Sequence, residues 1–352
     1  MNKSKIMILF GGCSSEYKVS LQSAYAVICN LDETRYEPVL IGIDFKGHWY
    51  LFEGNRDTIP EDTWWEQKEC YPAVVSMDKE LHGLMVFRNG FENGAQLLSV
   101  DAAFPVLHGK NGEDGTMQGV LELAGIPIVG CHTLASAVCM DKEMAHRLVK
   151  AAGVKVPRSV LILKETSAMA KEAAEVLQYP LFVKPLRAGS SFGITKVTKP
   201  EQLDQALELA FSYDTSVVME EMIDGFEVGC AVLGTKELFV GAVDEIELSE
   251  GFFDYTEKYT LKSSKIHVPA RVEEETAGRI KETAKLIYRS LDCSGFARVD
   301  MFLTPAGEIY FNEVNTIPGF TEHSRYPGMM RQAGLDFGGL VNRLTEMALQ
   351  GE

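Results

Sequence analysis

The sequence predicts a mixed α/β and α+β protein built from three packed units. Its 352 residues are too many for one ordinary hydrophobic core. In the first 130 residues, short apolar runs alternate with helical patterns, which is typical of an α/β unit with a mainly parallel sheet. Beyond that point, strands follow one another across tight loops, which favours antiparallel layers. We expect units at residues 1–130, 131–220 and 221–352, with the outer two meeting around a cleft.

The composition is that of a globular protein that can bury sizeable cores, with 46% hydrophobic and 24% charged residues. Fifty acids against thirty-four bases give a net charge of -16, which argues against nucleic acid or an anionic membrane as a partner. The seven cysteines contain no C-x-x-C pair, so neither a disulfide framework nor a structural zinc site is indicated. The first apolar run has only five residues, too short for a signal peptide or a spanning helix. We therefore expect a cytoplasmic location.

The first unit opens with an apolar strand that leads into two glycines. We expect a helix from Glu16, capped by Ser14 or Ser15, with an acid in the first turn as the helix dipole favours. His108 stands at the carboxyl end of a later strand, where sheets of this kind bind ligands. The expected elements are strands at 6–10, 38–43 and 101–107 and helices at 16–30 and 117–124.

The second and third units contain most of the predicted strands. A helix capped by Asp141 should run to Gly153, with Met144, Leu148 and Ala152 on one face. The other expected elements are helices at 203–211 and 274–289, a last amphipathic helix, and strands at 179–185, 194–197, 216–221, 226–234, 238–248, 296–303 and 309–315.

The last two predicted strands form a hairpin whose turn contains a proline and a glycine. Side chains two apart on a strand share a face, so Asp300 should lie opposite Glu313. Arg298 and Asn315 should lie on the same faces. Two carboxylates and an amide oxygen are hard ligands of the kind that Mg²⁺ prefers. The alternative is an Arg298–Glu313 salt bridge on a solvated face.

A glycine- and serine-rich loop, KPLRAGSSFG at residues 184–193, joins two predicted strands. Its small residues leave backbone amides open to an anion, and Lys184 adds a positive charge. The spacing is not that of a Walker loop, and an ordinary hairpin turn is the alternative. Lys142 follows the helix cap, where a cation opposes the helix dipole. It is either a tolerated surface lysine or the partner of a nearby anion.

Acidic residues follow the strand at 216–221. Glu220 and Glu221 lie at its end and Glu227 a few residues on. At the edge of an apolar pocket, such acceptors could bind an adenine amino group and ribose hydroxyls. Acids are common at strand ends, so this pattern alone does not identify an adenosine-binding site.

Seven motifs occur together and in order, and jointly they resemble the D-alanine–D-alanine ligase family of ATP-grasp enzymes. The resemblance covers nearly the whole chain. It implies an ATP-grasp fold with an N-terminal parallel α/β domain, a small central domain and a C-terminal domain, with the nucleotide between the last two and a lid loop at about 249–265. The motifs are GGCSSEYKVS, LHGKNGEDGTMQG, MDK, KPLRAGSSFG, EKY, FARVDMF and NEVNTIPGFTEHS.

In that family, ATP phosphorylates the carboxylate of a first D-alanine, and the amine of a second amino acid attacks the acyl phosphate. The resemblance implies that Asp300, Glu313 and Asn315 bind two Mg²⁺ ions, which Mn²⁺ could replace. The implied ATP-binding residues are Lys142, Lys184, Gly189, Ser190, Ser191, Glu220, Glu221, Ile223, Glu227 and Lys258.

The resemblance also assigns the substrate side of the site. Glu16 would bind the first ammonium group and form a linked triad with Ser190 and Tyr259. Arg298 and the amide of Gly319 would stabilise the oxyanion of the tetrahedral intermediate. No base for the attacking amine is implied. The substrate residues are Glu16, His108, Arg298, Gly319, Ser324 and Arg325.

Arg325 departs from the ordinary family pattern, in which an apolar residue, commonly leucine, occupies this position. A cation beside the second-substrate pocket favours a hydroxyl over a methyl group. D-lactate and D-serine both bear a hydroxyl, so Arg325 alone does not choose between them. The D-lactate ligases have a different lid loop that lacks the EKY tyrosine, whereas this chain keeps Lys258 and Tyr259. The combination is most similar to the VanG-type D-alanine–D-serine ligases of vancomycin resistance. A peptidoglycan terminus ending in D-serine binds vancomycin poorly.

Three other interpretations stay open at this point. One is a D-alanine–D-alanine ligase whose Arg325 turns away from the pocket. Another is a non-catalytic nucleotide-binding protein, although the metal ligands and Arg298 are all present. An NAD-dependent oxidoreductase would need G-x-G-x-x-G after the first strand, where the chain has GGCSSE. As partners we expect the small molecules D-alanine and D-serine, and the resemblance suggests a homodimer.

Overall fold

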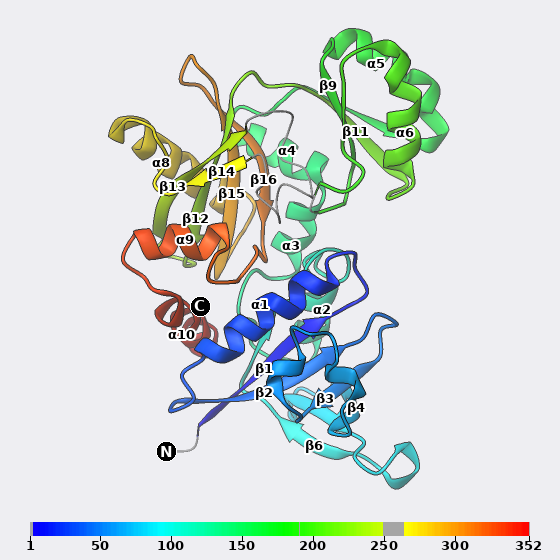
Figure 1. Ribbon diagram of the computed structural model, residues 1–352, viewed down its shortest axis with the longest axis vertical. Helices are drawn as coiled ribbons and strands as arrows, with labels where there is room; N and C mark the ends of the chain where they lie inside the picture. Colours follow the sequence, from blue (N-terminus) through cyan, green and yellow to red (C-terminus); the bar gives the residue numbers. More distant parts are fainter. Residues whose placement is uncertain (1–2, 190, 249–263, 352) are drawn as a thin grey trace.

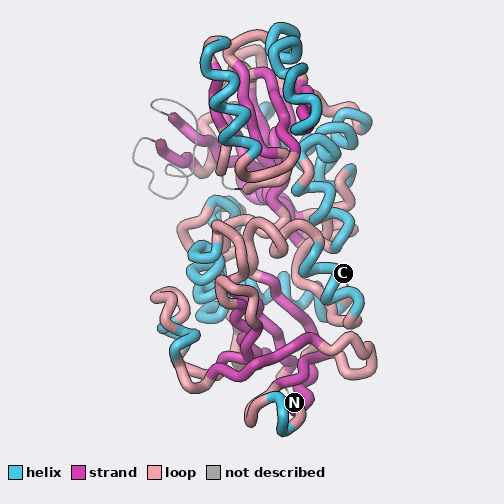
Figure 2. The backbone as a smooth tube through the Cα atoms, turned by 90° about the vertical axis from the view of Figure 1, so that its right-hand side faces the viewer, coloured by secondary structure: helices cyan, strands magenta, loops and turns pink. Residues whose placement is uncertain are grey.

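Three β-sheets form the core of the molecule. The computed structural model describes residues 3–189, 191–248 and 264–351. The sheets have seven, four and five strands. In Figure 1 the seven-stranded sheet lies at the bottom, the five-stranded sheet above it, and the four-stranded sheet at the upper right. Figure 2, turned by 90°, shows the four-stranded sheet at the top with helices packed against it.

The seven-stranded sheet is mixed, so the prediction of a mainly parallel sheet is wrong. Only β2–β1 and β1–β7 pair in parallel, whereas β2 to β6 form an antiparallel run. The physical reason is loop length: a parallel crossover needs roughly a dozen residues, and residues 44–48 are all that separate β2 from β3. In the order β6-β5-β4-β3-β2-β1-β7, the strands are β6 (Gln96–Ser99), β5 (Gly83–Val86), β4 (Cys70–Val75), β3 (Trp49–Phe52), β2 (Tyr36–Ile43), β1 (Ser4–Gly11) and β7 (Ala102–Pro105).

Alternate residues of β1 face opposite sides of this sheet, as the two-residue period of a strand requires. Ile8 belongs to the core that includes residues of α1 (Tyr17–Asn30), and Leu9 to the core that includes residues of α2 (Thr116–Leu123). Glu16, not Ser14 or Ser15, is the N-cap of α1. The predicted cap is therefore wrong, although Ser14 Oγ accepts a hydrogen bond of 3.1 Å from the Glu16 N–H.

The four-stranded sheet is antiparallel throughout, as predicted for this part of the chain. Leu181 and Val183 of β9 pack in a core with the two helices, which leaves Phe182 and Lys184 on the opposite face. The elements are β10 (Thr195–Val197), β9 (Leu181–Pro185), β11 (Ser216–Glu221), β8 (Ser159–Leu163), α5 (Ala170–Leu177) and α6 (Leu203–Phe211).

The five-stranded sheet is also antiparallel and carries the predicted hairpin. Its order is β14-β13-β12-β15-β16. Residues of α3, α4 and α8 share one core with this sheet, and α9 packs against β12 and β13. The elements are β14 (Ser264–His267), β13 (Phe239–Leu248), β12 (Phe226–Leu233), β15 (Phe296–Leu303), β16 (Ile309–Asn315), α3 (Thr133–Met140), α4 (Lys142–Ala151), α8 (Glu274–Ser290) and α9 (Arg325–Gln332).

Helix α4 begins at the predicted cap, since Asp141 accepts a hydrogen bond of 3.0 Å from the Met144 N–H. Its predicted apolar face is wrong, because Met144 and Leu148 are exposed. Val149 and Lys142 are buried instead. The first residue of the helix, Lys142, therefore points toward the protein interior and not toward solvent.

The seven- and five-stranded sheets share one hydrophobic core. Phe104 of β7, Phe296 of β15 and Tyr326 of α9 all belong to it, together with residues of α10 (Phe337–Gln350). Phe320 makes ring contacts with Phe104, Phe296 and Tyr326 at centroid distances of 5.4 to 6.0 Å. Within the part of the chain that the structure describes, no helix has the length and apolar character needed to cross a bilayer.

Candidate active site

A pocket of about 500 Å³ lies between the four- and five-stranded sheets. Its walls come from β9 and β11 on one side and from β12, β13, β15 and β16 on the other. Apolar side chains line part of it, and acids and lysines line the rest. The size and mixed lining suit a nucleotide-sized ligand. The apolar wall, which the sequence patterns do not single out, includes Phe182, Ile194, Met222 and Phe302.

The two predicted phosphate-binding lysines both line this pocket. Lys184 Nζ donates a hydrogen bond of 2.6 Å to Glu220 Oε1, and both side chains are buried. Lys142 Nζ donates one of 2.8 Å to the carbonyl oxygen of Ala188. Lys142 is therefore not a solvated surface lysine, and that alternative is wrong.

Glu221, Ile223 and Glu227 also line the pocket, as the adenosine site implied by the resemblance requires. The carboxylates of Glu221 and Glu227 both accept hydrogen bonds from arginines. Glu221 accepts hydrogen bonds from the backbone N–H and Nε of Arg158, at 2.8 and 2.6 Å. Glu227 Oε1 accepts one of 2.8 Å from Arg325 Nη1.

Glu16 lies between two glycine-rich loops. A Cβ added to Gly109 would lie 2.7 Å from Glu16 Oε2, and one added to Gly189 would lie 2.8 Å from the same atom. Both distances are shorter than an ordinary contact, so the loops approach this carboxylate closely and a Cβ at either position would displace it. Ser191 lines the nucleotide pocket next along the loop. Ser190, Lys258 and Tyr259 lie outside the described residues, so the predicted triad stays a prediction.

His108 is buried beside the same loop. Its Nδ1 lies 2.9 Å from the carbonyl oxygen of Ile317 and its Nε2 lies 3.3 Å from Ser23 Oγ. Burial lowers the pKa of His108, although the charge of Glu16 opposes this effect. The ring is therefore neutral and fixed between the first unit and the turn that precedes α9.

Glu113 is a residue of this region that the sequence patterns do not identify. Its Oε1 accepts a hydrogen bond of 3.0 Å from the Gly109 N–H. Burial raises the pKa of Glu113 to about 8, and the charge of Glu16 adds to the rise. A carboxyl with such a pKa changes protonation near neutral pH. The only sequence signal was its place in the glycine-rich loop that follows His108.

The hairpin has the predicted pairs near its open end, although a β-bulge between Asp300 and Met301 shifts the register closer to the turn. Asp300 pairs with Glu313, and Arg298 pairs with Asn315. Arg298 donates from Nε and Nη2 to Asp300 at 2.7 to 3.0 Å, and Asn315 Nδ2 donates to Asp300 Oδ2 at 3.0 Å. Arg298 and Asp300 are only 9% and 1% exposed. The alternative of a solvated Arg298–Glu313 face is therefore wrong.

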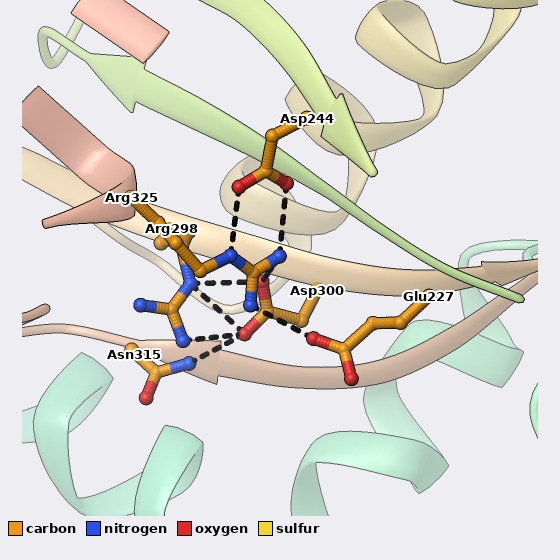
Figure 3. A network of polar contacts seen from close by, with 6 residues as sticks. All are labelled: Glu227, Asp244, Arg298, Asp300, Asn315 and Arg325. Carbon is orange, nitrogen blue, oxygen red and sulfur yellow. Dashed lines mark hydrogen bonds and ion pairs between the residues drawn. The ribbon is translucent and has the colours of Figure 1, made fainter. Parts of the chain in front are cut away.

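Arg325 lies at the start of α9 and is only 8% exposed. Nε and Nη2 donate to the two carboxylate oxygens of Asp244 at 2.7 and 2.9 Å, and Nη2 lies 3.3 Å from Asp300 Oδ1. Figure 3 shows that the guanidinium is surrounded by Asp244, Asp300 and Glu227. Burial alone would lower the pKa of Arg325, but the charges of Asp244 and Asp300 raise it well above its usual value. The side chain therefore stays charged and does not point into solvent.

Asp244 and Gly229 are two further residues that sequence patterns miss. Asp244 has 0% exposure and lies in the middle of β13. A Cβ on Gly229 would lie 2.4 Å from Arg325 Nη2 and 2.4 Å from Asp244 Oδ1, so this glycine makes room for the pair. Nothing in the sequence separates Asp244 from Glu245 and Glu247, the other acids of the same strand.

The turn after the hairpin brings Gly319 close to Ser324. A Cβ on Gly319 would lie 3.2 Å from Ser324 Oγ. Ser324 Oγ accepts a hydrogen bond of 3.0 Å from the Thr321 N–H, which holds the turn closed just before Arg325. The predicted oxyanion donor Gly319 and the predicted substrate residue Ser324 thus belong to one compact turn, and α9 begins directly after it at Arg325.

The donor set suits a hard divalent cation in chemistry. Asp300 and Glu313 lie on one face of the hairpin, and Glu313 lines the nucleotide pocket. Carboxylate and amide oxygens are the ligands that Mg²⁺ prefers. Across the described ranges, no group of three or more His, Cys, Asp or Glu side chains is arranged to hold a metal ion. The hairpin offers only two carboxylates and the amide oxygen of Asn315. A cation bound there would keep other coordination positions for substrate phosphates.

The three-sheet fold, with a pocket between the smaller sheets, is that of an ATP-grasp enzyme. Family models described as D-ala D-ala ligase N-terminus and D-ala D-ala ligase C-terminus match residues 5–131 and 148–346. The chain belongs to the D-Ala-D-Ala ligase family and is an ATP-dependent ligase.

Similar proteins include both resistance ligases and ordinary ones. The crystal structure of the VanG D-Ala:D-Ser ligase from Enterococcus faecalis is 56% identical, with a TM-score of 0.91, and the match covers 99% of this chain and 100% of that one. The vancomycin/teicoplanin A-type resistance protein VanA of Enterococcus faecium is 47% identical, with 100% of both chains covered. A D-alanine–D-alanine ligase of Caldicellulosiruptor bescii is 41% identical, over 99% of this chain and 96% of its own length.

Proposed function

We propose that this enzyme joins D-alanine to D-serine through a D-alanyl phosphate intermediate. The carboxylate of D-alanine attacks the γ-phosphorus of ATP and ADP leaves. The amine of D-serine then attacks the acyl carbon, loses a proton, and releases inorganic phosphate. The product would give peptidoglycan precursors a D-serine terminus with low affinity for vancomycin.

The residues of the pocket support specific parts in this reaction. Lys142 and Lys184 line the pocket and would hold the phosphates, and Glu16, which lies beside the glycine-rich loops, would accept hydrogen bonds from the ammonium group of D-alanine. Arg298 is held by Asp300 beside the hairpin, where it could stabilise an oxyanion. When bound, two Mg²⁺ ions at Asp300, Glu313 and Asn315 would supply positive charge to the transferring phosphoryl group.

The observation that carries D-serine is the position of Arg325. Its guanidinium is buried and fixed by Asp244, so it presents a polar surface where a leucine would present an apolar one. Beside the N–H that it donates to Glu227, Nη1 has a second N–H, and we propose that a hydroxyl of the second substrate accepts it. D-serine has this hydroxyl and D-alanine does not.

Product analysis tests the proposed substrate. Purified protein is incubated with ATP, Mg²⁺ and isotope-labelled D-alanine, with and without equal D-serine, and the dipeptides are identified by mass spectrometry. We expect D-alanyl-D-serine to dominate whenever D-serine is present. A product that contains only D-alanine would overturn the proposal and favour ordinary cell-wall synthesis.

The metal ligands can be tested separately. Glu313→Gln keeps the size of the side chain and removes its charge. We expect ADP release to fall by about 100-fold or more, as for loss of a group that stabilises transition-state charge, while ATP binding measured by calorimetry weakens far less. Equal losses in both would favour a simple binding role for Glu313.

We also propose that the enzyme is a homodimer, on the basis of the family resemblance. Light scattering coupled to size exclusion should then give a mass twice that of one chain. A single-chain mass at micromolar protein would contradict this.

A further inference from the structure

Ser23 is a residue of helix α1 with 0% exposure, and it connects the first unit to the turn after β16. Its Oγ accepts a hydrogen bond of 3.3 Å from the N–H of Phe320 and lies 3.3 Å from His108 Nε2. Phe320 directly follows Gly319, the predicted oxyanion donor. One buried hydroxyl group therefore reaches from the first helix of the chain to the residue beside that donor.

The partners of the His108 ring determine the direction of these hydrogen bonds. Its Nδ1 lies 2.9 Å from the carbonyl oxygen of Ile317, which can only accept, so Nδ1 carries the proton. Burial lowers the pKa of His108 and favours the neutral ring, in which Nε2 is then an acceptor. The hydroxyl of Ser23 therefore donates to Nε2, while its oxygen accepts the N–H of Phe320.

This chain of hydrogen bonds holds two peptide planes of the turn. Residues 316–320 belong to no helix or strand, so no regular ladder of hydrogen bonds orients them. His108 holds the carbonyl oxygen of Ile317, and Ser23 holds the N–H of Phe320. The N–H of Gly319 belongs to the peptide plane between these two. That middle plane is further restricted because Pro318, which precedes it, has a fixed φ.

The N–H of Gly319 is the one that this arrangement leaves available. Within the part of the chain that the structure describes, it donates no hydrogen bond to another residue. Gly319 is half-buried, whereas its neighbours Pro318 and Phe320 are buried. An oxyanion donor is effective only when its N–H is held in advance toward the place where charge develops. The buried neighbours supply such a constraint.

We propose that Ser23 is a positioning residue for the oxyanion site: together with His108 it fixes the peptide planes on both sides of the Gly319 N–H, so that this N–H points at the oxygen of the tetrahedral intermediate. The inference rests on the proposed function, because that intermediate forms when an amine attacks the acyl carbon of D-alanyl phosphate. It gives helix α1 a part in the second step of the reaction and none in the first.

Single-turnover kinetics separates the two steps. Enzyme in excess over ATP is mixed with Mg²⁺, D-alanine and D-serine, the reaction is quenched at successive times, and ADP and dipeptide are both quantified. The first step transfers a phosphoryl group and has no tetrahedral carbon, so it does not need the Gly319 N–H. In Ser23→Ala we expect dipeptide formation to slow by about 10- to 100-fold, while ADP formation stays within about threefold of the wild type. ADP should therefore appear well before the dipeptide.

Ser136→Ala is the matched control. Ser136 is also fully buried in a helix, α3, but its Oγ has no hydrogen-bond partner among the described residues. The same substitution there should leave both rate constants unaltered. Ser23→Cys provides a second variant if Ser23→Ala does not fold, because a thiol is similar in size and is only a weak donor and acceptor. It should slow the same step.

Two results in an active wild type would overturn the inference alone. An equal loss of ADP and dipeptide formation in the Ser23 variants would assign Ser23 a purely structural role, and unchanged dipeptide formation would show that the oxyanion site does not depend on it. A wild type that uses only D-alanine overturns the D-serine proposal, and the same comparison is then made with D-alanine as both substrates. A wild type that forms no dipeptide overturns the proposed function and this inference with it.

Discussion

At the scale of single residues, Asp244 determines where Arg325 lies. It is fully buried, and its carboxylate accepts two hydrogen bonds from one guanidinium. Such a pair contributes little compared with a well-packed apolar pair, but removing one partner leaves an uncompensated buried charge. The pair therefore acts mainly as a positional constraint on the second-substrate site.

Arg325→Met should destabilise the protein by about 3 to 5 kcal/mol, because Asp244 loses its partner in a buried site. Urea unfolding at constant pH measures this. Adding Asp244→Asn should recover part of the loss, whereas Arg331→Met should change stability by less than about 0.5 kcal/mol. If Arg325→Met and Arg331→Met unfold at the same urea concentration, the buried Arg325–Asp244 pair does not contribute to stability as expected.

Glu113 predicts a pH effect of definite sign. Its pKa is about 8 in the folded protein against an ordinary value of 4.5, so between these values the folded state binds a proton that the unfolded chain has released. The contribution of Glu113 to the free energy of unfolding therefore falls as pH rises through this window and levels off above about pH 8. Urea unfolding at several pH values should give a shallower decline for Glu113→Gln than for the wild type. Parallel pH profiles would contradict the assignment.

At the scale of elements, the hairpin β15–β16 was predictable and much of its surroundings was not. The Pro/Gly turn predicts the hairpin. The pairing of Asp300 with Glu313 also needs a β-bulge between Asp300 and Met301, which the alternation does not predict. Asp244 gave almost no signal, since it is one of three acids in its strand and the sequence does not reveal which of them a distant arginine will neutralise. Gly229 has no distinguishing feature in the sequence, because its close contacts with Arg325 and Asp244 appear only in the folded structure.

Two predictions from the sequence were wrong for the same kind of reason. The first sheet was expected to be mainly parallel because strand-like and helical patterns alternate, but the short chain between β2 and β3 permits only a hairpin. The face of α4 was predicted from its apolar residues, yet the helix buries Lys142 and leaves Met144 exposed. In both cases a tertiary constraint outweighed a local pattern.

Strand β12 should not tolerate a methyl group at Gly229. Gly229→Ala places a Cβ 2.4 Å from both Arg325 Nη2 and Asp244 Oδ1, so we expect a loss of about 1 to 3 kcal/mol and weaker D-serine use. Urea unfolding and the dipeptide assay measure the two effects.

Gly278→Ala is the matched control, since no atom lies within 4 Å of its added Cβ and it lies inside helix α8. That change should stabilise the protein by about 0.5 to 1 kcal/mol. If both alanine variants stabilise, Gly229 is not required for close packing.

At the scale of the whole molecule, the three sheets are not equally joined. The seven- and five-stranded sheets share a core, while the four-stranded sheet packs mainly with its own helices α5 and α6. The nucleotide pocket lies across the less tightly joined boundary. Opening at this boundary is the motion expected to admit ATP.

Leu181→Ala should weaken the four-stranded sheet selectively. Leu181 is fully buried in the core of that sheet, so its truncation should cost about 2 to 5 kcal/mol there. Hydrogen exchange resolved by mass spectrometry should speed up in residues 159–221 and remain unchanged in β1. Ile8→Ala, in the shared core, should instead speed exchange in both larger sheets. A uniform increase in all sheets for Leu181→Ala would indicate one cooperative unit.

The arrangement around residue 325 also limits how this enzyme can change its specificity over generations. The arginine is matched to an aspartate on β13 and fits against a glycine on β12, so these three positions constrain one another. A change of Arg325 to leucine alone would leave Asp244 buried without its partner, and we expect that single variant to fold poorly whatever its substrate preference. Laboratory lineages driven toward an apolar second substrate should therefore acquire replacements at 244 before, or together with, those at 325.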